Sequence, residues 1–262
     1  TKEYAVFIEL HEDVVLTDSL DALKAKFEFN QIKTNNKALT VADITRKKGD
    51  SSILGKLVAN KVGKPYSDKI DKLNLVTTKG FSIKLKDPKL ELQVISLDDL
   101  DAKELEKLKK CLKDELNIDE FPKELRFAKS ELSDVQFQSI VIGEISNLIT
   151  RLYPNSQYNS TSIYQLLFDE LKRIGVDTND YTEWDELLKK KSLTSNQVKA
   201  VIESLTSGKN ETTINQEFQQ VCHDLSLNSM QSISLKKDFD RYRQNKFKNK
   251  SALQIDIANK IS

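Results

Sequence analysis

The first third of the chain carries the hydrophobic pattern of β-strands. Residues 4–10 are apolar at both odd and even positions, which is typical of a strand buried on both faces. Residues 13–16 and 26–34 follow after short connections, so the three segments predict an antiparallel meander. Residues 73–78 and 90–95 predict two further strands.

Helical periodicity dominates the remainder of the sequence. A helix is predicted between Ser52, which resembles an N-cap, and Gly63. One more short strand is predicted at 125–128, and helices are predicted at 101–116, 135–152, 160–174, 183–190, 195–206, 211–225, 230–248 and 251–261. Only 7 Gly and 4 Pro punctuate the chain, which favours long helices over an all-β sandwich.

This order of elements predicts that the chain forms two structural regions. Residues 1–153 are expected to form an α/β domain with a mixed sheet, and residues 154–262 an all-helical region for oligomerisation or partner binding. The boundary is placed at Tyr153, where Pro, Asn and Ser interrupt the apolar periodicity.

Composition narrows the classes of function. Lys and Arg number 41 and Asp and Glu number 40, giving a net charge of +1, which excludes a globally basic protein that coats nucleic acid. Any site for a polyanion must therefore be a local patch. Two Cys and two His without zinc spacing exclude a disulfide scaffold and argue against structural zinc. Low cysteine usage fits the cytoplasm, and no apolar run approaches the roughly 20 residues of a membrane span.

The most informative residues lie on the second and third predicted strands. Gln31 and Lys33 are two apart, so they project from the same face of a strand, and Asp13 opens the neighbouring strand, where it could lie opposite them. Asp13, the Gln31 side-chain carbonyl and the Ile32 backbone carbonyl offer hard oxygens for Mg²⁺ or Mn²⁺. Lys33 offers positive charge for a developing phosphoryl transition state.

Other readings of these patterns stay open. A Gln-x-Lys spacing is common by chance, and the alternative is a polar strand end with solvated side chains. Glu9 and Glu12 are candidate additional carboxylates. Lys47, Lys48 and Lys56, together with other basic residues around the helix predicted after Ser52, could bind phosphates or form an ordinary solvated helix face. The basic and aromatic stretch 236–250 is expected to serve packing or partner binding rather than DNA binding.

The runs ELHEDVVL, FNQIKT, SILGKLVANK and KLNLVTT resemble the double-stranded DNA endonuclease domain of CD-NTase-associated (Cap-type) anti-phage effectors. That domain belongs to the PD-(D/E)xK restriction-endonuclease-like superfamily, in the branch where Gln replaces an acidic residue. The resemblance covers residues 4–96 most strongly and continues to about residue 171. Members of the family usually have a helix before the first strand, so this helix is expected to be missing here.

The resemblance implies a metal-dependent endodeoxyribonuclease with a restriction-endonuclease-like mixed sheet flanked by helices. It implies that Asp13 binds the metal, that Gln31 takes the acidic position and that Lys33 is catalytic, with Glu9 as an accessory acid. Double-stranded DNA is the implied substrate, and a homo-oligomer, a sensor or a HerA-type ATPase are implied partners. The alternative is a non-catalytic DNA-binding or assembly subunit that acts only with such a partner.

Overall fold

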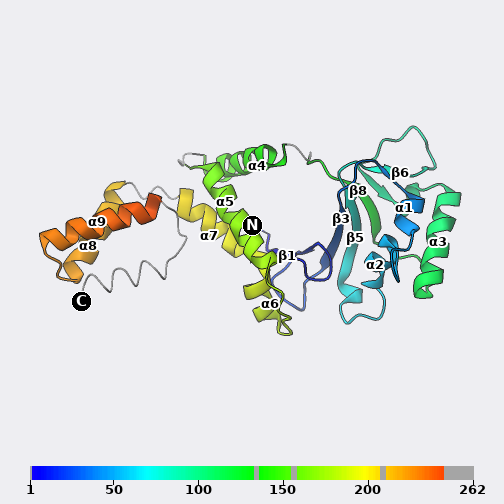
Figure 1. The fold of residues 1–262 in the computed structure, drawn as a ribbon, viewed down its shortest axis with the longest axis horizontal. Helices are drawn as coiled ribbons and strands as arrows, with labels where there is room; N and C mark the ends of the chain where they lie inside the picture. The colour runs from blue at the N-terminus through cyan, green and yellow to red at the C-terminus, as the bar shows by residue number, and fades with distance from the viewer. Residues whose placement is uncertain (1, 133–135, 155–157, 207–210, 245–262) are drawn as a thin grey trace. The chain divides into compact units, whose positions relative to one another are not determined.

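A computed structural model describes the chain except at residues 1, 133–135, 155–157, 207–210 and 245–262 (Figure 1). Two compact units divide after Thr206, the first spanning Thr1–Thr206 and the second Ser207–Ser262. No helix in the described part of the chain is long and apolar enough to cross a membrane.

A seven-stranded mixed sheet organises the first unit. Its strand order is β7-β8-β5-β3-β2-β1-β9, with β3, β5 and β8 parallel and the remaining neighbours antiparallel. The strands of this sheet are β1 (Ala5–Ile8), β2 (Val14–Thr17), β3 (Phe27–Lys33), β5 (Ile70–Thr77), β7 (Val94–Ser96), β8 (Leu125–Lys129) and β9 (Ser192–Thr194). Two short strands, β4 (Leu39–Thr40) and β6 (Phe81–Ser82), pair separately.

Three helices accompany the central strands in one hydrophobic core, and Figure 1 shows them together beside the sheet. They are α1 (Val41–Thr45), α2 (Ile53–Ala59) and α3 (Ala102–Leu116). Helix α2 begins at Ser52, whose side chain accepts a hydrogen bond from the backbone of Gly55, and it buries Leu54, Leu57 and Val58.

The N-terminus of α2 is also fixed from α3. The Glu115 carboxylate accepts hydrogen bonds from the Ser52 backbone nitrogen at 3.0 Å and from the Ser52 hydroxyl at 3.1 Å. A Cβ atom on Gly55 would lie 1.9 Å from Glu115 Oε2, so a larger residue at position 55 would push this carboxylate away from Ser52. The helix that carries Lys56 and Asn60 is therefore held in position by a neighbouring element.

The sheet is completed by residues far along the chain. Strand β9 pairs antiparallel with β1, and α6 (Trp184–Lys191) leads directly into it. Trp184 donates from Nε1 to the Leu20 carbonyl at 2.7 Å and packs against Phe7 and Phe27. Residues beyond Tyr153 are thus part of the sheet and its core.

The remaining helices form two smaller clusters. Helices α4 (Phe137–Leu152), α5 (Ser160–Gly175) and α7 (Ser195–Thr206) enclose Ile149, Ile163 and Ile202. In the second unit, α8 (Glu211–Asp224) and α9 (Ser229–Gln244) pack around Phe218, Cys222 and Leu235.

The mixed sheet flanked by helices and the helical C-terminal region confirm the predicted restriction-endonuclease-like fold. The antiparallel meander of the first three strands is confirmed as well. The expected division at Tyr153 differs from the break after Thr206, because β9 hydrogen-bonds to β1 and so returns the chain to the sheet. The expected helix at 251–261 and much of the basic stretch 236–250 lie outside the described residues.

The Trp184 contact generates a test of how far this domain extends. Trp184→Ala should lower the free energy of unfolding by about 3 kcal/mol, because it empties space beside two aromatic rings and leaves the Leu20 carbonyl unpaired. Urea unfolding followed by circular dichroism measures the change. Leu23→Ala is the control, since Leu23 is 87 % exposed and should shift stability by less than about 0.5 kcal/mol. Equal stability of the two variants would contradict the role given to Trp184.

Candidate functional site

The candidate site lies where β2 begins and β3 ends. Because β2 and β3 are antiparallel with Val14 opposite Asn30, Asp13 falls opposite Gln31 at the end of the pair. Asp13 Oδ2 accepts a hydrogen bond from Gln31 Nε2 at 2.5 Å and one from the Ile32 backbone nitrogen at 2.6 Å. Because the N–H and C=O groups of one strand residue point to the same side, we infer that the Ile32 carbonyl also faces the side of Asp13.

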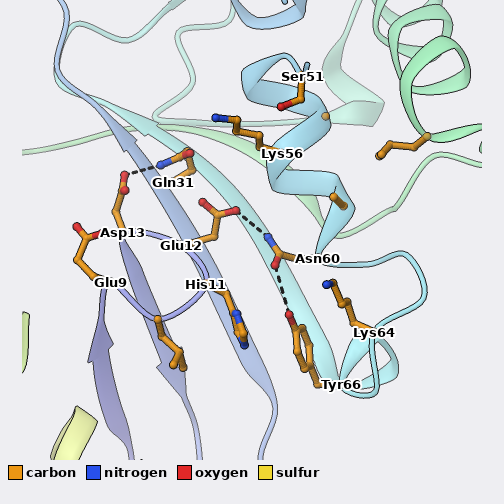
Figure 2. Close-up of a pocket in the computed structure, with 14 residues that line it drawn as sticks. Glu9, His11, Glu12, Asp13, Gln31, Ser51, Lys56, Asn60, Lys64 and Tyr66 are labelled. Atoms are coloured by element: carbon orange, nitrogen blue, oxygen red, sulfur yellow. Dashed lines mark hydrogen bonds between the residues drawn. The ribbon is translucent and has the colours of Figure 1, made fainter. Parts of the chain in front are cut away.

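The loop between β1 and β2 carries the acidic residues. Glu9 adopts a left-handed conformation with φ of 52°, and its backbone nitrogen donates to the Asp13 carbonyl at 3.1 Å, which closes the turn. Glu9 is exposed, and Figure 2 shows its side chain on the side of Asp13 that faces away from α2. The turn thus gathers Glu9, Glu12 and Asp13 at one end of the hairpin.

An open pocket of about 550 Å³ joins this loop to α2 and the segment that follows the helix. Lys56 and Asn60 are four residues apart, so they project from one side of α2 toward the loop (Figure 2). The pocket is lined by Glu9, Leu10, His11, Glu12, Asp13, Gln31, Ser51, Gly55, Lys56, Ala59, Asn60, Lys64, Tyr66 and Leu116.

Glu12 is the most deeply placed carboxylate in the pocket, with 7 % of its surface exposed. Its Oε1 accepts a hydrogen bond from Asn60 Nδ2 at 2.7 Å. Burial raises the pKa of Glu12 to about 7; the hydrogen bond from Asn60 opposes this rise, and the charge of Asp13 adds to it. The charges of Lys33 and Lys56 also oppose the rise, because they favour the ionised form of Glu12.

Aromatic side chains form the other end of the pocket. The His11 ring stacks on Tyr66 at 5.1 Å between centroids and lies 6.4 Å from Phe29. Burial, followed by the charge of Lys64, lowers the pKa of His11, which favours the neutral imidazole. Burial, followed by the charge of Glu12, raises the pKa of Tyr66. This end of the pocket therefore offers neutral rings beside one lysine.

The three lysines expected to contact DNA occupy different places. Lys56 lines the pocket on α2. Lys47 and Lys48 are exposed in the connection between α1 and α2, where the Lys48 backbone nitrogen donates to the Ser51 carbonyl at 3.1 Å. Both lie outside the pocket lining, and Lys48 pairs with Ser51, which is part of it.

The donor atoms of the site suit a hard divalent cation. Asp13 and Glu12 supply carboxylate oxygens, while Gln31 and the Ile32 backbone supply neutral carbonyl oxygens, the ligand types that Mg²⁺ and Mn²⁺ prefer. Within the described ranges, no three His, Cys, Asp or Glu side chains converge as a metal centre. A cation here would therefore depend on amide and backbone oxygens, water and substrate phosphate.

The structure brings most of the residues expected from the sequence to one place. Asp13, Gln31 and Glu9 line the pocket, and the Ile32 backbone bonds to Asp13. Lys33 ends β3 outside the pocket lining, and its charge lowers the pKa of Glu12. Sequence reasoning did not assign His11, Asn60 or Tyr66 to the site. The spacing of Lys56 and Asn60 on one helix face was the available signal for Asn60.

Comparison with known proteins gives the family of the chain. No curated protein and no solved structure matches the chain. The family model described as "Cap4, dsDNA endonuclease domain" matches residues 1–175, which include the whole pocket. The chain therefore belongs to the Cap4 double-stranded DNA endonuclease domain family.

Proposed function

We propose that this protein cleaves double-stranded DNA by divalent-metal-dependent phosphodiester hydrolysis at the pocket between the β1–β2 loop and α2. The observation that carries the proposal is the convergence of Asp13, Gln31 and the Ile32 backbone at the end of β3, within a chain of an endonuclease family. Anti-phage defence is the setting that the resemblance implies for this activity.

The residues have distinct parts in the proposed reaction. Asp13 and the carbonyl oxygens of Gln31 and Ile32 would hold Mg²⁺ or Mn²⁺, and Glu12 adds a further carboxylate. The bound ion would polarise the phosphate and lower the pKa of an attacking water. Lys33 orients that water and stabilises negative charge as it develops on the phosphoryl oxygens. Lys56 balances charge at the pocket wall.

Binding of the duplex is proposed to follow the basic side of the pocket. Lys56 lies at the pocket, and Lys47 and Lys48 extend the positive charge along the connection before α2. Because the whole chain carries a net charge of only +1, this local patch must supply the attraction for phosphates.

Lys33→Ala and Asp13→Asn should each reduce the cleavage rate of a plasmid by roughly 100-fold or more. Asparagine is preferred at position 13, because alanine would also leave the Ile32 backbone nitrogen without its acceptor. Initial rates measured on supercoiled plasmid, together with melting temperatures, give the test. Lys37→Ala is the control, since Lys37 is exposed and lies outside the pocket lining. Cleavage at the wild-type rate by a folded Lys33→Ala protein would remove Lys33 from the mechanism.

Cleavage should require Mg²⁺ or Mn²⁺ and should stop when EDTA is added, because the site offers oxygen donors. The measurement is plasmid cleavage after exhaustive dialysis against chelator, with each ion then added back separately. Undiminished cleavage in EDTA would be incompatible with a metal-dependent reaction.

Replacing Lys47, Lys48 and Lys56 together by Gln should flatten the slope of log affinity against log salt. Each phosphate contact contributes roughly −0.9 to that slope on duplex DNA. Binding is titrated at several salt concentrations on a Lys33→Ala background. The matched control replaces three exposed lysines of α3, namely Lys103, Lys109 and Lys110. If the α3 set changes the slope as much as the first set, DNA does not follow the proposed path.

A further inference from the structure

The Glu12 carboxylate depends on an outside contact for its orientation. It belongs to the loop between β1 and β2, which has no regular secondary structure at Glu12. Its Oε1 accepts from Asn60 Nδ2 at 2.7 Å, and Figure 2 shows its other oxygen on the side of Asp13. A long, flexible carboxylate keeps one rotamer in a pocket only when a fixed group binds it.

Asn60 is such a fixed group. It is the C-cap residue of α2 and is 7 % exposed. Its amide nitrogen donates to the Leu57 carbonyl at 3.2 Å as well as to Glu12, and its amide oxygen lies 3.5 Å from the Tyr66 hydroxyl. With both amide protons engaged and a donor near the oxygen, only one orientation of the side chain satisfies all its partners.

We propose that Asn60 is a positioning residue that holds Glu12 against Asp13 and thereby sets the affinity of the pocket for a divalent cation. This inference rests on the proposed metal-dependent cleavage. Asn60 acts through Glu12, in the way that a hydrogen-bonding partner behind a metal ligand fixes the direction of that ligand. Loss of such partners commonly weakens metal binding or activity about 10- to 100-fold.

The chain offers a matched control in Asn74. Asn74 is also 7 % exposed, and its amide nitrogen donates to Glu28 Oε1 at 2.8 Å and to Asn30 Oδ1 at 2.9 Å. These partners lie on the opposite face of the sheet from Gln31, because Asn30 and Gln31 are adjacent on one strand. Asn74→Ala therefore removes a buried amide-to-carboxylate hydrogen bond without touching the pocket.

The test compares Asn60→Ala, Asn60→Leu and Asn74→Ala. Asn60→Leu keeps the approximate size of the side chain, adds no charge and removes the donated hydrogen bond, so it serves if the alanine variant does not fold. Mn²⁺ is titrated by calorimetry into protein saturated with a short DNA duplex, on a Lys33→Ala background that prevents turnover. Cleavage kinetics and melting temperatures are measured for the same substitutions with Lys33 present.

Both Asn60 variants should bind Mn²⁺ about tenfold more weakly or worse, and kcat should fall by a similar factor while KM for DNA changes less than about twofold. Asn74→Ala should lose thermal stability but keep Mn²⁺ affinity and kcat. Adding Asn60→Ala to Glu12→Gln should cause no further loss of Mn²⁺ affinity, because the two residues act as one unit.

Three results would overturn the inference: wild-type Mn²⁺ affinity in a folded Asn60 variant, equal losses in Asn74→Ala, or additive losses in the double variant. Absence of Mn²⁺ binding by the protein with Asn60 intact would also overturn it. If the wild-type protein binds Mn²⁺ but cleaves no duplex, the proposed function fails, and the calorimetric comparison still decides the role of Asn60.

Discussion

The Asp13 carboxylate fixes the β1–β2 loop against the end of β3. Asp13 Oδ2 bonds both to the Gln31 side chain and to the Ile32 backbone, so it ties the β1–β2 loop to the end of β3. An ionised acceptor makes each of these hydrogen bonds stronger than a neutral pair would. The positions of Glu9 and Glu12 follow, because both are within four residues of Asp13 in the same loop. The other wall of the pocket then comes from α2.

Opposing charges are distributed unevenly across that pocket. The loop contributes Glu9, Glu12 and Asp13, whereas α2 and the segment after it contribute Lys56 and Lys64. Acidic side chains gathered in a partly buried place repel one another and lose hydration, which is why burial and Asp13 raise the pKa of Glu12 to about 7. A ligand that carries positive charge on one side and negative charge on the other would bind favourably to such a site. A cation bound to a phosphate has that character.

Local patterns predicted the strands and the pairing that places the main residues. The order of the apolar segments predicts the antiparallel meander, and this pairing places Asp13 opposite Gln31. Side chains alternate between the two faces of a strand, so Gln31 and Lys33 share one face. Asn60 and Tyr66 were missed, because they reach the loop only through the packing of α2 against the sheet. Strand β9 was missed because three residues, Ser-Leu-Thr between two helices, are too few to show a period. Non-local packing, which no local period encodes, accounts for these misses.

Gly55 has a consequence for how the site forms during folding. Glycine is a poor helix former, and α2 has only seven residues, so this helix has little tendency to exist alone. It takes its place when Glu115 of α3 binds Ser52 across the space that Gly55 leaves open. A nascent chain that has emerged only as far as β5 therefore lacks the support for one wall of the pocket. The pocket should then become complete late in synthesis, after α3 has docked against α2.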